Sequence, residues 1–523
     1  MSGGYSMTGA ASSTGSDVRV PYDVMIYQDA TYTYAIKADG TLISSGAIAT
    51  SNVQFQAAHD YLTLGGLIFV DKGTYTFAAP VAVDHNHINI QGAVPEFANF
   101  YFPRVMFQGT AATDFFDIAG SFFGVYGIYF ADGLNCLHFS VPVDKNLFNP
   151  NVQYCVFEDQ TGYSVYLNDT HAATYGFIGE IIIANNLFLH KNGGGVADQP
   201  AFVRIESYVY ATYITIKDNC FEPGATVHLD FPAGEVLEFA EIANNYSEES
   251  TNDHTFIQIE CNSPTAYRWG AGIHGNIFNT DSSVAANRGY FCKINTAVGA
   301  LAGLAIHHNY TNGIIQITNT NTGGGAPDAY IAGVHIHHNH IAFGAIIITG
   351  CATWYNMGVA ITDNTIIGNA TLGQVTCTRT DELTITGNFF GNANVIAIDQ
   401  FKSVTFTHNK VYWYYATYTV TFTNRSGTAP CYVKDNVGYI GENHGRTSVA
   451  DAGTIAHGLS GTPTWAVVSG TVATTSDSIF VTAMDATNLT IAIKKLSLAE
   501  GAPNIISYVA GTTQYVNWIC GVF

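Results

Sequence analysis

Residues 183–188 read IANNLF, and close variants of this phrase return along the chain. The clearest variants are IKDNCF (216–221), IHGNIF (273–278), ITDNTI (361–366) and ITGNFF (385–390). Looser copies extend the set to the asparagines at positions 186, 219, 245, 276, 309, 339, 364, 388, 409 and 436. Their spacing runs from 21 residues (388 to 409) to 33 residues (186 to 219). A repeat unit of roughly 20–35 residues is typical of a solenoid.

Each unit is short and rich in β-branched and aromatic residues, which predicts stacked coils of parallel strands. The residue three positions before each Asn, such as Ile183 or Ile216, is expected to point into the coil. The Asn itself is expected at a corner, with left-handed backbone angles and its amide bonded to the next Asn in the stack. An earlier variant, VQYCVF (152–157), puts Cys155 in the Asn slot.

Composition excludes several classes of protein. Hydrophobic residues make up 47% of the 523 residues and charged residues only 11%, with 19 Lys plus Arg against 40 Asp plus Glu and a formal net charge of −21. This acidic balance argues against a nucleic-acid or anionic-membrane partner. Nine cysteines without a CxxC pair argue against a disulfide framework or a zinc site, and we expect no metal and no cofactor.

The chain divides into three parts. Residues 1–50 are expected to be a flexible segment followed by short strands, serving attachment, with a turn at Ala38-Asp39-Gly40. Residues 51–445 are expected to form the β-helix, opened by a capping helix over 52–62 that covers its end. Residues 446–523 contain about seven alternating segments, which predicts a small β-sandwich. The N-terminus shows no Sec signal, and no apolar run reaches the ~18 residues that span a bilayer.

The stretches QAAHDYL (56–62) and GGLIFVDKGTYTF (65–77) resemble the first coil of the pectate-lyase-like superfamily of right-handed parallel β-helices. The resemblance implies that fold but no particular activity, since the superfamily holds lyases, hydrolases and non-catalytic viral spikes. The calcium and arginine signature of pectate lyases is not recognisable. AHGLSGTPTWAVV (456–468), NLTIAI (488–493) and VNWICGVF (516–523) resemble C-terminal domains of viral tail fibres and spikes, which implies a trimerising module.

Two columns of outward side chains follow when the strands after the corners are aligned. The aligned segments are SVYLND (164–169), FVRIES (202–207), TVHLDF (226–231), FIQIEC (256–261), FCKINT (291–296) and IIQITN (314–319). Because side chains alternate along a strand, one column runs Tyr166, Arg204, His228, Gln258, Lys293 and Gln316. The other column runs Asn168, Glu206, Asp230, Glu260, Asn295 and Thr318.

Glu206, Asp230 and Glu260 are the candidate catalytic residues. On successive coils they would lie ~5 Å apart, with the outer two ~10 Å apart, close to the separations of retaining and inverting glycoside hydrolases. Like charges at this distance should also raise one pKa, as a general acid requires. Arg204, His228, Gln258 and Tyr166 are the candidate substrate-binding residues. A solvated or merely sugar-binding acidic face and a cation site are the alternatives.

Three further features are weaker candidates. Glu222 and Glu248 form a second acidic pair, with Glu158 as their counterpart at the Cys155 corner. A column of imidazoles, His274, His307 and His337 with His308 and His338 beside it, has a spacing that favours ring stacking over a shared metal ion. The aromatic run Tyr412, Trp413, Tyr414, Tyr415 and Tyr418 suits either a sugar platform or a seam between chains.

The leading hypothesis is a viral tailspike-like or tail-fibre-like homotrimer that binds, and in one version cleaves, a host-surface polysaccharide. It places the protein on a virion or at a cell surface, attached through its N-terminus to a tail or baseplate. One alternative is a secreted or cell-surface polysaccharide hydrolase or lyase. The other is a non-catalytic structural surface or filament protein. The sequence leaves open which glycan is bound and whether it is hydrolysed, cleaved by elimination or only held.

Overall fold

The computed structural model describes most of the chain. The described residues are 21–93, 105–141, 146–168, 177–189, 201–207, 210–222, 226–231, 236–249, 255–261, 267–280, 289–296, 301–320, 331–351, 355–368, 374–391, 395–412, 419–424, 431–437, 442–449, 452–457, 459, 462–463, 465–471, 477–498, 506–510 and 514–521. The proposed flexible segment at residues 1–20 lies outside them.

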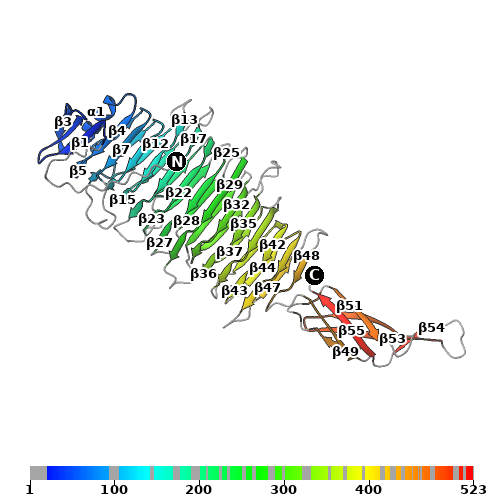
Figure 1. Ribbon diagram of the computed structural model, residues 1–523. Coiled ribbons are helices and arrows are strands. Elements are labelled where there is room, and N and C mark those ends of the chain that lie inside the picture. Colours follow the sequence, from blue (N-terminus) through cyan, green and yellow to red (C-terminus); the bar gives the residue numbers. More distant parts are fainter. Residues whose placement is uncertain are drawn as a thin grey trace.

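The described chain is a parallel β-helix, as the repeat predicts. Figure 1 shows its coils stacked from the blue strands at one end to the yellow strands at the other. Three long sheets run along it, one of 22 strands and two of 13 strands each. Successive strands of each 13-stranded sheet pair in parallel, one coil apart. We call the 22-stranded sheet the first sheet and the other two the second and third sheets, in the order in which each coil visits them.

The strands of the first sheet carry the residues before each Asn corner. They are β1 Val24–Gln28, β2 Tyr32–Lys37, β3 Leu42–Ala47, β4 Gly66–Val70, β7 Ile88–Gly92, β10 Gly124–Tyr126, β13 Asn146–Phe148, β14 Asn151–Gln153, β17 Phe177–Gly179, β18 Ile182–Ala184, β21 Tyr210–Thr212, β22 Ile214–Lys217, β25 Val236–Leu237, β26 Ala240–Ala243, β29 Tyr267–His274, β32 Leu301–His307, β35 Ile331–His337, β38 Asn356–Thr362, β41 Thr380–Asp381, β42 Leu383–Thr386, β45 Val404–Thr407 and β48 Cys431–Lys434.

The second sheet follows directly after the corners. Its strands are β5 Gly73–Thr76, β8 Val105–Gln108, β11 Tyr129–Ala131, β15 Val156–Glu158, β19 Leu187–Leu189, β23 Cys220–Phe221, β27 Tyr246–Glu249, β30 Ile277–Thr280, β33 Tyr310–Thr311, β36 His340–Ala342, β39 Thr365–Ile367, β43 Phe389–Gly391 and β46 Lys410–Tyr412.

The third sheet completes each coil and carries the candidate site. Its strands are β6 Val81–Val83, β9 Phe116–Ile118, β12 Leu137–Ser140, β16 Val165–Asn168, β20 Val203–Glu206, β24 Val227–Phe231, β28 Thr255–Cys261, β31 Tyr290–Thr296, β34 Ile314–Asn319, β37 Ile346–Thr349, β40 Val375–Thr378, β44 Val395–Asp399 and β47 Thr419–Thr423.

The predicted capping helix is present as α1, Asn52–Tyr61. Phe55 on this helix is buried and its ring contacts Tyr75, Phe77 and Phe107, with centroid separations of 5.0 to 5.7 Å. A short 3-10 turn, Ile48–Thr50, precedes the helix. Strands β1, β2 and β3 form an antiparallel meander that joins the first sheet through β1 and β4.

The corner asparagines form a continuous ladder, which is buried from Asn186 to Asn409. In a typical step the Oδ1 of Asn309 accepts hydrogen bonds from the backbone N and the Nδ2 of Asn276, both at 3.0 Å. The Nδ2 of Asn309 donates to Ile273 O and to Asn339 Oδ1, both at 2.9 Å. Equivalent steps run from Asn186 to Asn436. Cys155 continues the ladder: its backbone N donates to Asn186 Oδ1 at 2.9 Å, and its Sγ lies 3.8 Å from Val125 O, where an Asn would place its Nδ2.

The expected left-handed angle falls one residue earlier than predicted. None of the ladder asparagines has a positive φ, whereas the residue before each of them does. These preceding residues are Asn185, Asp218, Asn244, Gly275, His308, His338, Asp363, Gly387, His408 and Asp435, with φ between 54° and 69°. The reason is that the Asn amide must point into the turn to reach its neighbour. The turn from the first sheet to the second is therefore made by the residue before the Asn.

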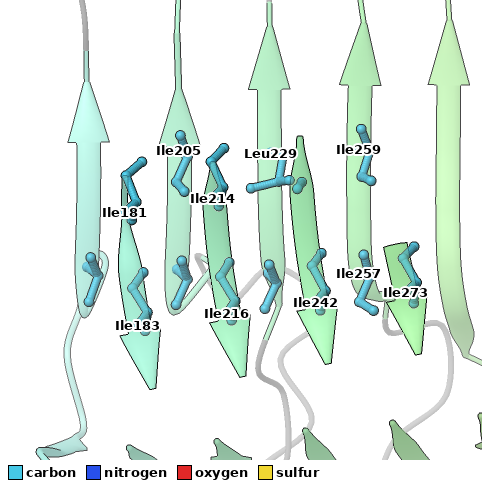
Figure 2. Packing of buried hydrophobic residues seen from close by; sticks show 14 of the residues in the cluster. Ile181, Ile183, Ile205, Ile214, Ile216, Leu229, Ile242, Ile257, Ile259 and Ile273 are labelled. Atoms are coloured by element: carbon cyan, nitrogen blue, oxygen red, sulfur yellow. The ribbon is translucent and has the colours of Figure 1, made fainter. Parts of the chain in front are cut away.

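Buried side chains repeat coil by coil inside the solenoid. Figure 2 shows isoleucines such as Ile183, Ile216 and Ile242 stacked at one-coil spacing, facing Ile205 and Ile259 of the third sheet. All of them are at most 1% exposed, which confirms the predicted inward positions. The nine cysteines all lie within the described residues, none of them forms a disulfide, and seven are buried, as is usual for small core residues.

The C-terminal region forms two antiparallel sheets, seen in orange and red in Figure 1. Their strands are β49 Glu442–Val449, β50 Thr454–Ala456, β51 Trp465–Thr471, β52 Asp477–Met484, β53 Asn488–Leu498, β54 Ile506–Ala510 and β55 Gln514–Gly521. Leu489, Ile491, Ile493 and Cys520 are the centre of a small core separate from that of the solenoid. These seven strands are the β-sandwich that the alternating segments predict.

Candidate functional site

The two predicted columns lie on the outer face of the third sheet. The parallel register pairs Glu206 of β20 with Asp230 of β24, and Asp230 with Glu260 of β28. The same register pairs Arg204 with His228 and His228 with Gln258. Tyr166 of β16 precedes Arg204, and Asn168 precedes Glu206. The structure therefore brings all seven predicted site residues together on four neighbouring strands.

The position of these strands within the coil differs from the expectation. The strand directly after a corner, such as β19, belongs to the second sheet, and the site strand β20 is the one after it. The two columns are unaffected, since each coil contributes one strand to the third sheet. The intervening strands have only two to four residues, which is too short to show an alternating pattern in the sequence.

Arg204 is the centre of the site. Its Nη2 lies 3.0 Å from Asp230 Oδ2 and 3.2 Å from Glu206 Oε2, so one guanidinium bridges two of the three carboxylates. Its Nη1 donates to the hydroxyl of Tyr163 at 3.3 Å, and the guanidinium carbon lies 5.6 Å from the centre of that ring. Tyr163 was not predicted, because it precedes β16 and lies outside the alternating pattern.

Tyr166 connects the arginine to the coils before it. Its hydroxyl donates to Glu206 Oε2 at 3.3 Å and accepts from Asn168 Nδ2 at 2.6 Å. Its ring stacks on His138 of β12, with centroids 5.1 Å apart and planes 10° apart. Burial, followed by the charge of Glu206, raises the pKa of Tyr166 to about 12. The phenol is therefore a neutral hydrogen-bonding group at physiological pH.

Glu260 and Asp230 occupy different environments although they are neighbours. The Oε1 of Glu260 accepts from Gln258 Nε2 at 2.6 Å, and its Oε2 lies 3.7 Å from His228 Nε2. The Oδ1 of Asp230 is buried and has no hydrogen-bond partner among the described residues. His228, Asp230 and Glu260 each place one ligand-type atom within 4.8 Å of the others.

The surroundings shift the pKa values of Asp230 and Glu260 in opposite directions. Burial raises the pKa of Asp230, and this outweighs the lowering by the nearby His228 and Arg204. His228 lowers the pKa of Glu260 to about 2 against the opposing effect of burial. The sequence argument expected repulsion between like charges to raise one pKa. Such repulsion contributes at Asp230, but burial is the larger cause.

The polar face continues beyond the predicted residues. Asp117 of β9 pairs in register with His138, and His138 Nδ1 lies 2.9 Å from Asp117 Oδ1 and 3.9 Å from Asp114 Oδ2. A cation is one possible occupant of this cluster or of the cluster at Asp230, since carboxylate and imidazole atoms meet in both. The strip from Asp117 to Gln258 follows the third sheet over five successive strand pairings.

The imidazole column is confirmed as a stack. His274, His307 and His337 lie parallel with centroids 4.9 Å apart, and His308 stacks on His338 at 5.1 Å. Burial, together with the neighbouring imidazoles, lowers the pKa of His307 to about 4. The column lies at the end of the first sheet, because its members end β29, β32 and β35.

The other weak candidates stand apart from the third-sheet site. Burial and the charge of Glu248 raise the pKa of Glu222, so these two acidic side chains do influence each other. The Tyr129 hydroxyl donates to Glu158. Tyr412 is half exposed and its ring stacks on Phe389. The remaining aromatic residues of that run lie outside the described residues.

Comparisons with known proteins find similarity in structure only. No protein-family model matches the chain, and no curated protein matches its sequence. Among solved structures, a double mutant of the tailspike protein of E. coli bacteriophage HK620 aligns over 93% of this chain and 92% of its own, with a TM-score of 0.42 and 11% identity. The same tailspike in complex with a pentasaccharide aligns over the same shares, with a TM-score of 0.40 and 11% identity.

A second kind of β-helix protein also aligns. The A-module of Azotobacter vinelandii mannuronan C-5 epimerase AlgE6 covers 74% of this chain and 94% of its own, with a TM-score of 0.32 and 13% identity. At these identities and TM-scores no residue role passes from those proteins to this chain. Among the described residues, no helix is both long and apolar enough to cross a membrane.

Proposed function

We propose that the third-sheet site binds a polysaccharide and hydrolyses its glycosidic bonds, with Asp230 as the general acid and Glu260 as the ionised carboxylate. The observation that carries the proposal is that the pKa values of two neighbouring carboxyl groups, those of Asp230 and Glu260, are shifted in opposite directions. Burial raises the pKa of Asp230, whereas His228 lowers that of Glu260 to about 2. A pair of titratable groups pushed apart in this way is the usual basis of acid and base roles.

The spacing supports a two-step reaction with retention of configuration. The nearest ligand atoms of Asp230 and Glu260 lie within 4.8 Å, in the range of retaining enzymes, whose carboxyl groups are about 5–5.5 Å apart. Asp230 gives its proton to the glycosidic oxygen as the bond to the leaving sugar breaks. Glu260 attacks the anomeric carbon to form a glycosyl ester. Asp230, now ionised, takes a proton from water, and that water releases the sugar from Glu260.

The surrounding residues supply binding. Arg204 presents a guanidinium beside both Glu206 and Asp230, which suits a sugar that carries a carboxylate or another acidic group. The stacked rings of His138 and Tyr166, together with Tyr163, offer flat surfaces for sugar rings. Glu206 is assigned to orienting Arg204 and Tyr166 rather than to proton transfer, since it contacts both.

The test is release of oligosaccharides from acidic bacterial capsule and cell-wall glycans by the full chain. Asp230→Asn and Glu260→Gln should each lower the rate by at least 10²-fold, the lower end of the usual effect of an acid–base group. The matched control is Glu222→Gln, which changes the other acidic pair and should leave the rate unchanged. Product release that survives both site variants would refute the assignment.

A negative result with every glycan would leave only binding, and glycan-array affinity would then be compared between Arg204→Ala and the wild type. We further propose that the chain is a homotrimer that serves as a spike or fibre for attachment to a host surface. This rests on the resemblance of the C-terminal module to trimerising domains. Light scattering after size exclusion tests it, and a stable monomer would contradict it.

A further inference from the structure

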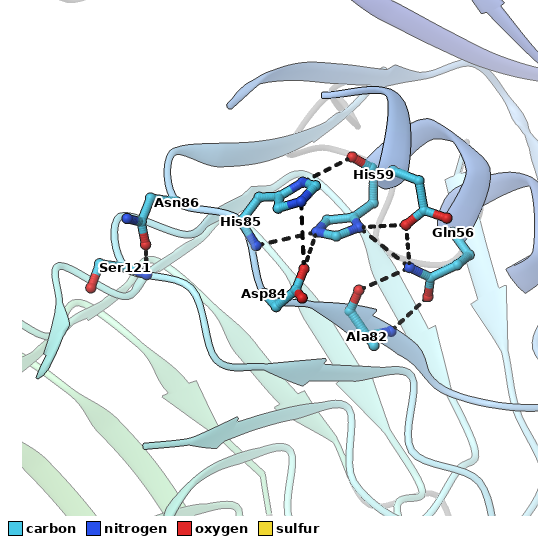
Figure 3. A network of polar contacts seen from close by, with 8 residues as sticks. Gln56, His59, Ala82, Asp84, His85, Asn86 and Ser121 are labelled. Atoms are coloured by element: carbon cyan, nitrogen blue, oxygen red, sulfur yellow. Dashed lines mark hydrogen bonds and ion pairs between the residues drawn. The ribbon is translucent and has the colours of Figure 1, made fainter. Parts of the chain in front are cut away.

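A second polar cluster lies beside the capping helix α1. Figure 3 shows His59 of α1 against Asp84 and His85, which directly follow β6. The side chain of His59 is 3% exposed, whereas those of Asp84 and His85 are 70% and 28% exposed. The cluster therefore has one fixed, buried member and two members that face solvent.

Both ring nitrogens of His59 have polar partners. The backbone N–H of His85 donates to His59 Nε2 at 3.3 Å, so Nε2 bears a lone pair. Nδ1 lies 3.0 Å from Asp60 Oδ1 and 3.3 Å from Gln56 Nε2.

His85 is oriented in the same way. Its Nδ1 lies 3.3 Å from the carbonyl oxygen of His59, which can only accept, so Nδ1 is the donor and Nε2 bears the lone pair. Both Nε2 atoms then approach one carboxylate oxygen, Asp84 Oδ1, at 3.3 Å from His59 and 3.7 Å from His85. The His85 backbone N–H already engages the lone pair of His59 Nε2, so a positive species bound among the three atoms would take the place of that hydrogen bond.

The distances suit a metal ion as that species. Zinc bound tetrahedrally at about 2.0–2.1 Å holds its ligand atoms about 3.3 Å apart, and the three ligand atoms here lie within 4.8 Å of one another. A carboxylate or carbonyl on the second imidazole nitrogen is the usual partner of a metal-binding histidine. Asp60 and the His59 carbonyl already occupy those positions.

We propose that His59, Asp84 and His85 bind one divalent transition-metal ion, with zinc the best match, and so fasten the capping helix to the first coils. The two rings are stacked 4.2 Å apart, so binding requires one of them to turn. That one is His85, because its ring is partly exposed while His59 is enclosed. A water molecule completes the four-coordinate site, which leaves one position open to solvent.

The experiment uses the full chain, stripped of metal and titrated with Zn²⁺ by calorimetry. We expect one ion per chain at this site, with affinity lowered at least tenfold by Asp84→Asn and by His85→Gln. Asp60→Asn, which removes only the group behind His59, should weaken binding by about 10-fold or more. Co²⁺ in place of Zn²⁺ should give the intense visible absorption of a tetrahedral site, and the variants should lose it.

The other surface histidines provide the control. The double variant His308→Asn/His338→Asn removes an exposed imidazole pair of the stacked column and should bind as the wild type does. Both site substitutions are at solvent-facing positions, and unchanged circular dichroism would confirm that the variants fold. Absence of saturable binding, binding that survives His85→Gln, or binding lost in the His308/His338 control would each overturn the proposal.

Discussion

Substitution of one ladder asparagine tests the physical basis of the fold most directly. Asn309→Ala removes the amide that accepts from the backbone N and Nδ2 of Asn276 and donates to Ile273 O and Asn339 Oδ1. The side chain lies at the middle of the ladder and is only 2% exposed. Four hydrogen bonds are lost at once in a place that water reaches poorly.

The expected loss of unfolding free energy follows from the hydrogen-bonding groups that the substitution leaves without a partner. The backbone N–H of Asn276 loses its acceptor, and a stranded buried donor costs about 1–3 kcal/mol. The other three bonds contribute about 1 kcal/mol each. The sum, about 4–6 kcal/mol, is at the upper end of the effects of single substitutions. Asn309→Asp should also be severe, since it retains the acceptor but loses the donor and buries a charge.

Two measurements check this expectation. The urea midpoint of Asn309→Ala should fall well below that of the control Asn312→Ala, which loses one exposed hydrogen bond to Asn279 Oδ1. Hydrogen exchange at the Asn276 amide should accelerate strongly in the first variant and stay unchanged in the control. If both variants have the same midpoint and the Asn276 amide remains protected, the ladder does not stabilise the coils.

Three further results are expected. Arg204→Gln should weaken binding of an acidic glycan about tenfold and shift the upper limb of the pH–rate profile to higher pH, since it removes the positive charge that lowers the pKa of Asp230. Stability should fall as pH drops from 6.5 towards 4, because His307 takes up its proton at about 4 when folded but near 6.5 when unfolded; His307→Asn should flatten this dependence in urea unfolding. Gly387→Ala should lower the urea midpoint, because the backbone there has φ of +69° and the added methyl would meet Asp363 Oδ1.

Each of these has a contradicting outcome. An unchanged pH profile for Arg204→Gln would show that the charge of Arg204 does not act on Asp230. A wild-type stability that is flat between pH 6.5 and 4 would remove the proton linkage assigned to His307. Gly272→Ala is the matched control for the glycine, because its new methyl makes only an ordinary contact with His274. An equal fall in the urea midpoint of both glycine variants would show that the positive φ at Gly387 does not account for the loss of stability.

The sequence was sufficient to predict the fold and the neighbours within the candidate site. A corner marker that recurs in phase with the strands sets the register, so Glu206, Asp230 and Glu260 could be placed side by side although 24 and 30 residues separate them. Alternation along each strand then separated the inward isoleucines from the outward polar side chains. Both regularities are properties of backbone geometry, which the sequence pattern reflects directly.

Features without such a period could not be predicted. Tyr163 reaches Arg204 from outside a strand, and His59 meets Asp84 and His85 across a helix and a turn. The direction of the two pKa shifts also depends on how deeply each carboxyl group is buried, which differs between adjacent strands of the same sheet. The left-handed residue was assigned one position late because Asn is itself tolerant of that conformation.

The ladder has a consequence for how proteins of this shape diversify. Neighbouring asparagines are held at one-coil spacing whether 21 or 33 residues separate them, so the stack does not sense the length of chain between its steps. Whole segments can be inserted, deleted or exchanged between coils while the frame stays in register. The segments between the steps can therefore differ in length and composition from coil to coil, while the amide stack that supports them keeps one geometry.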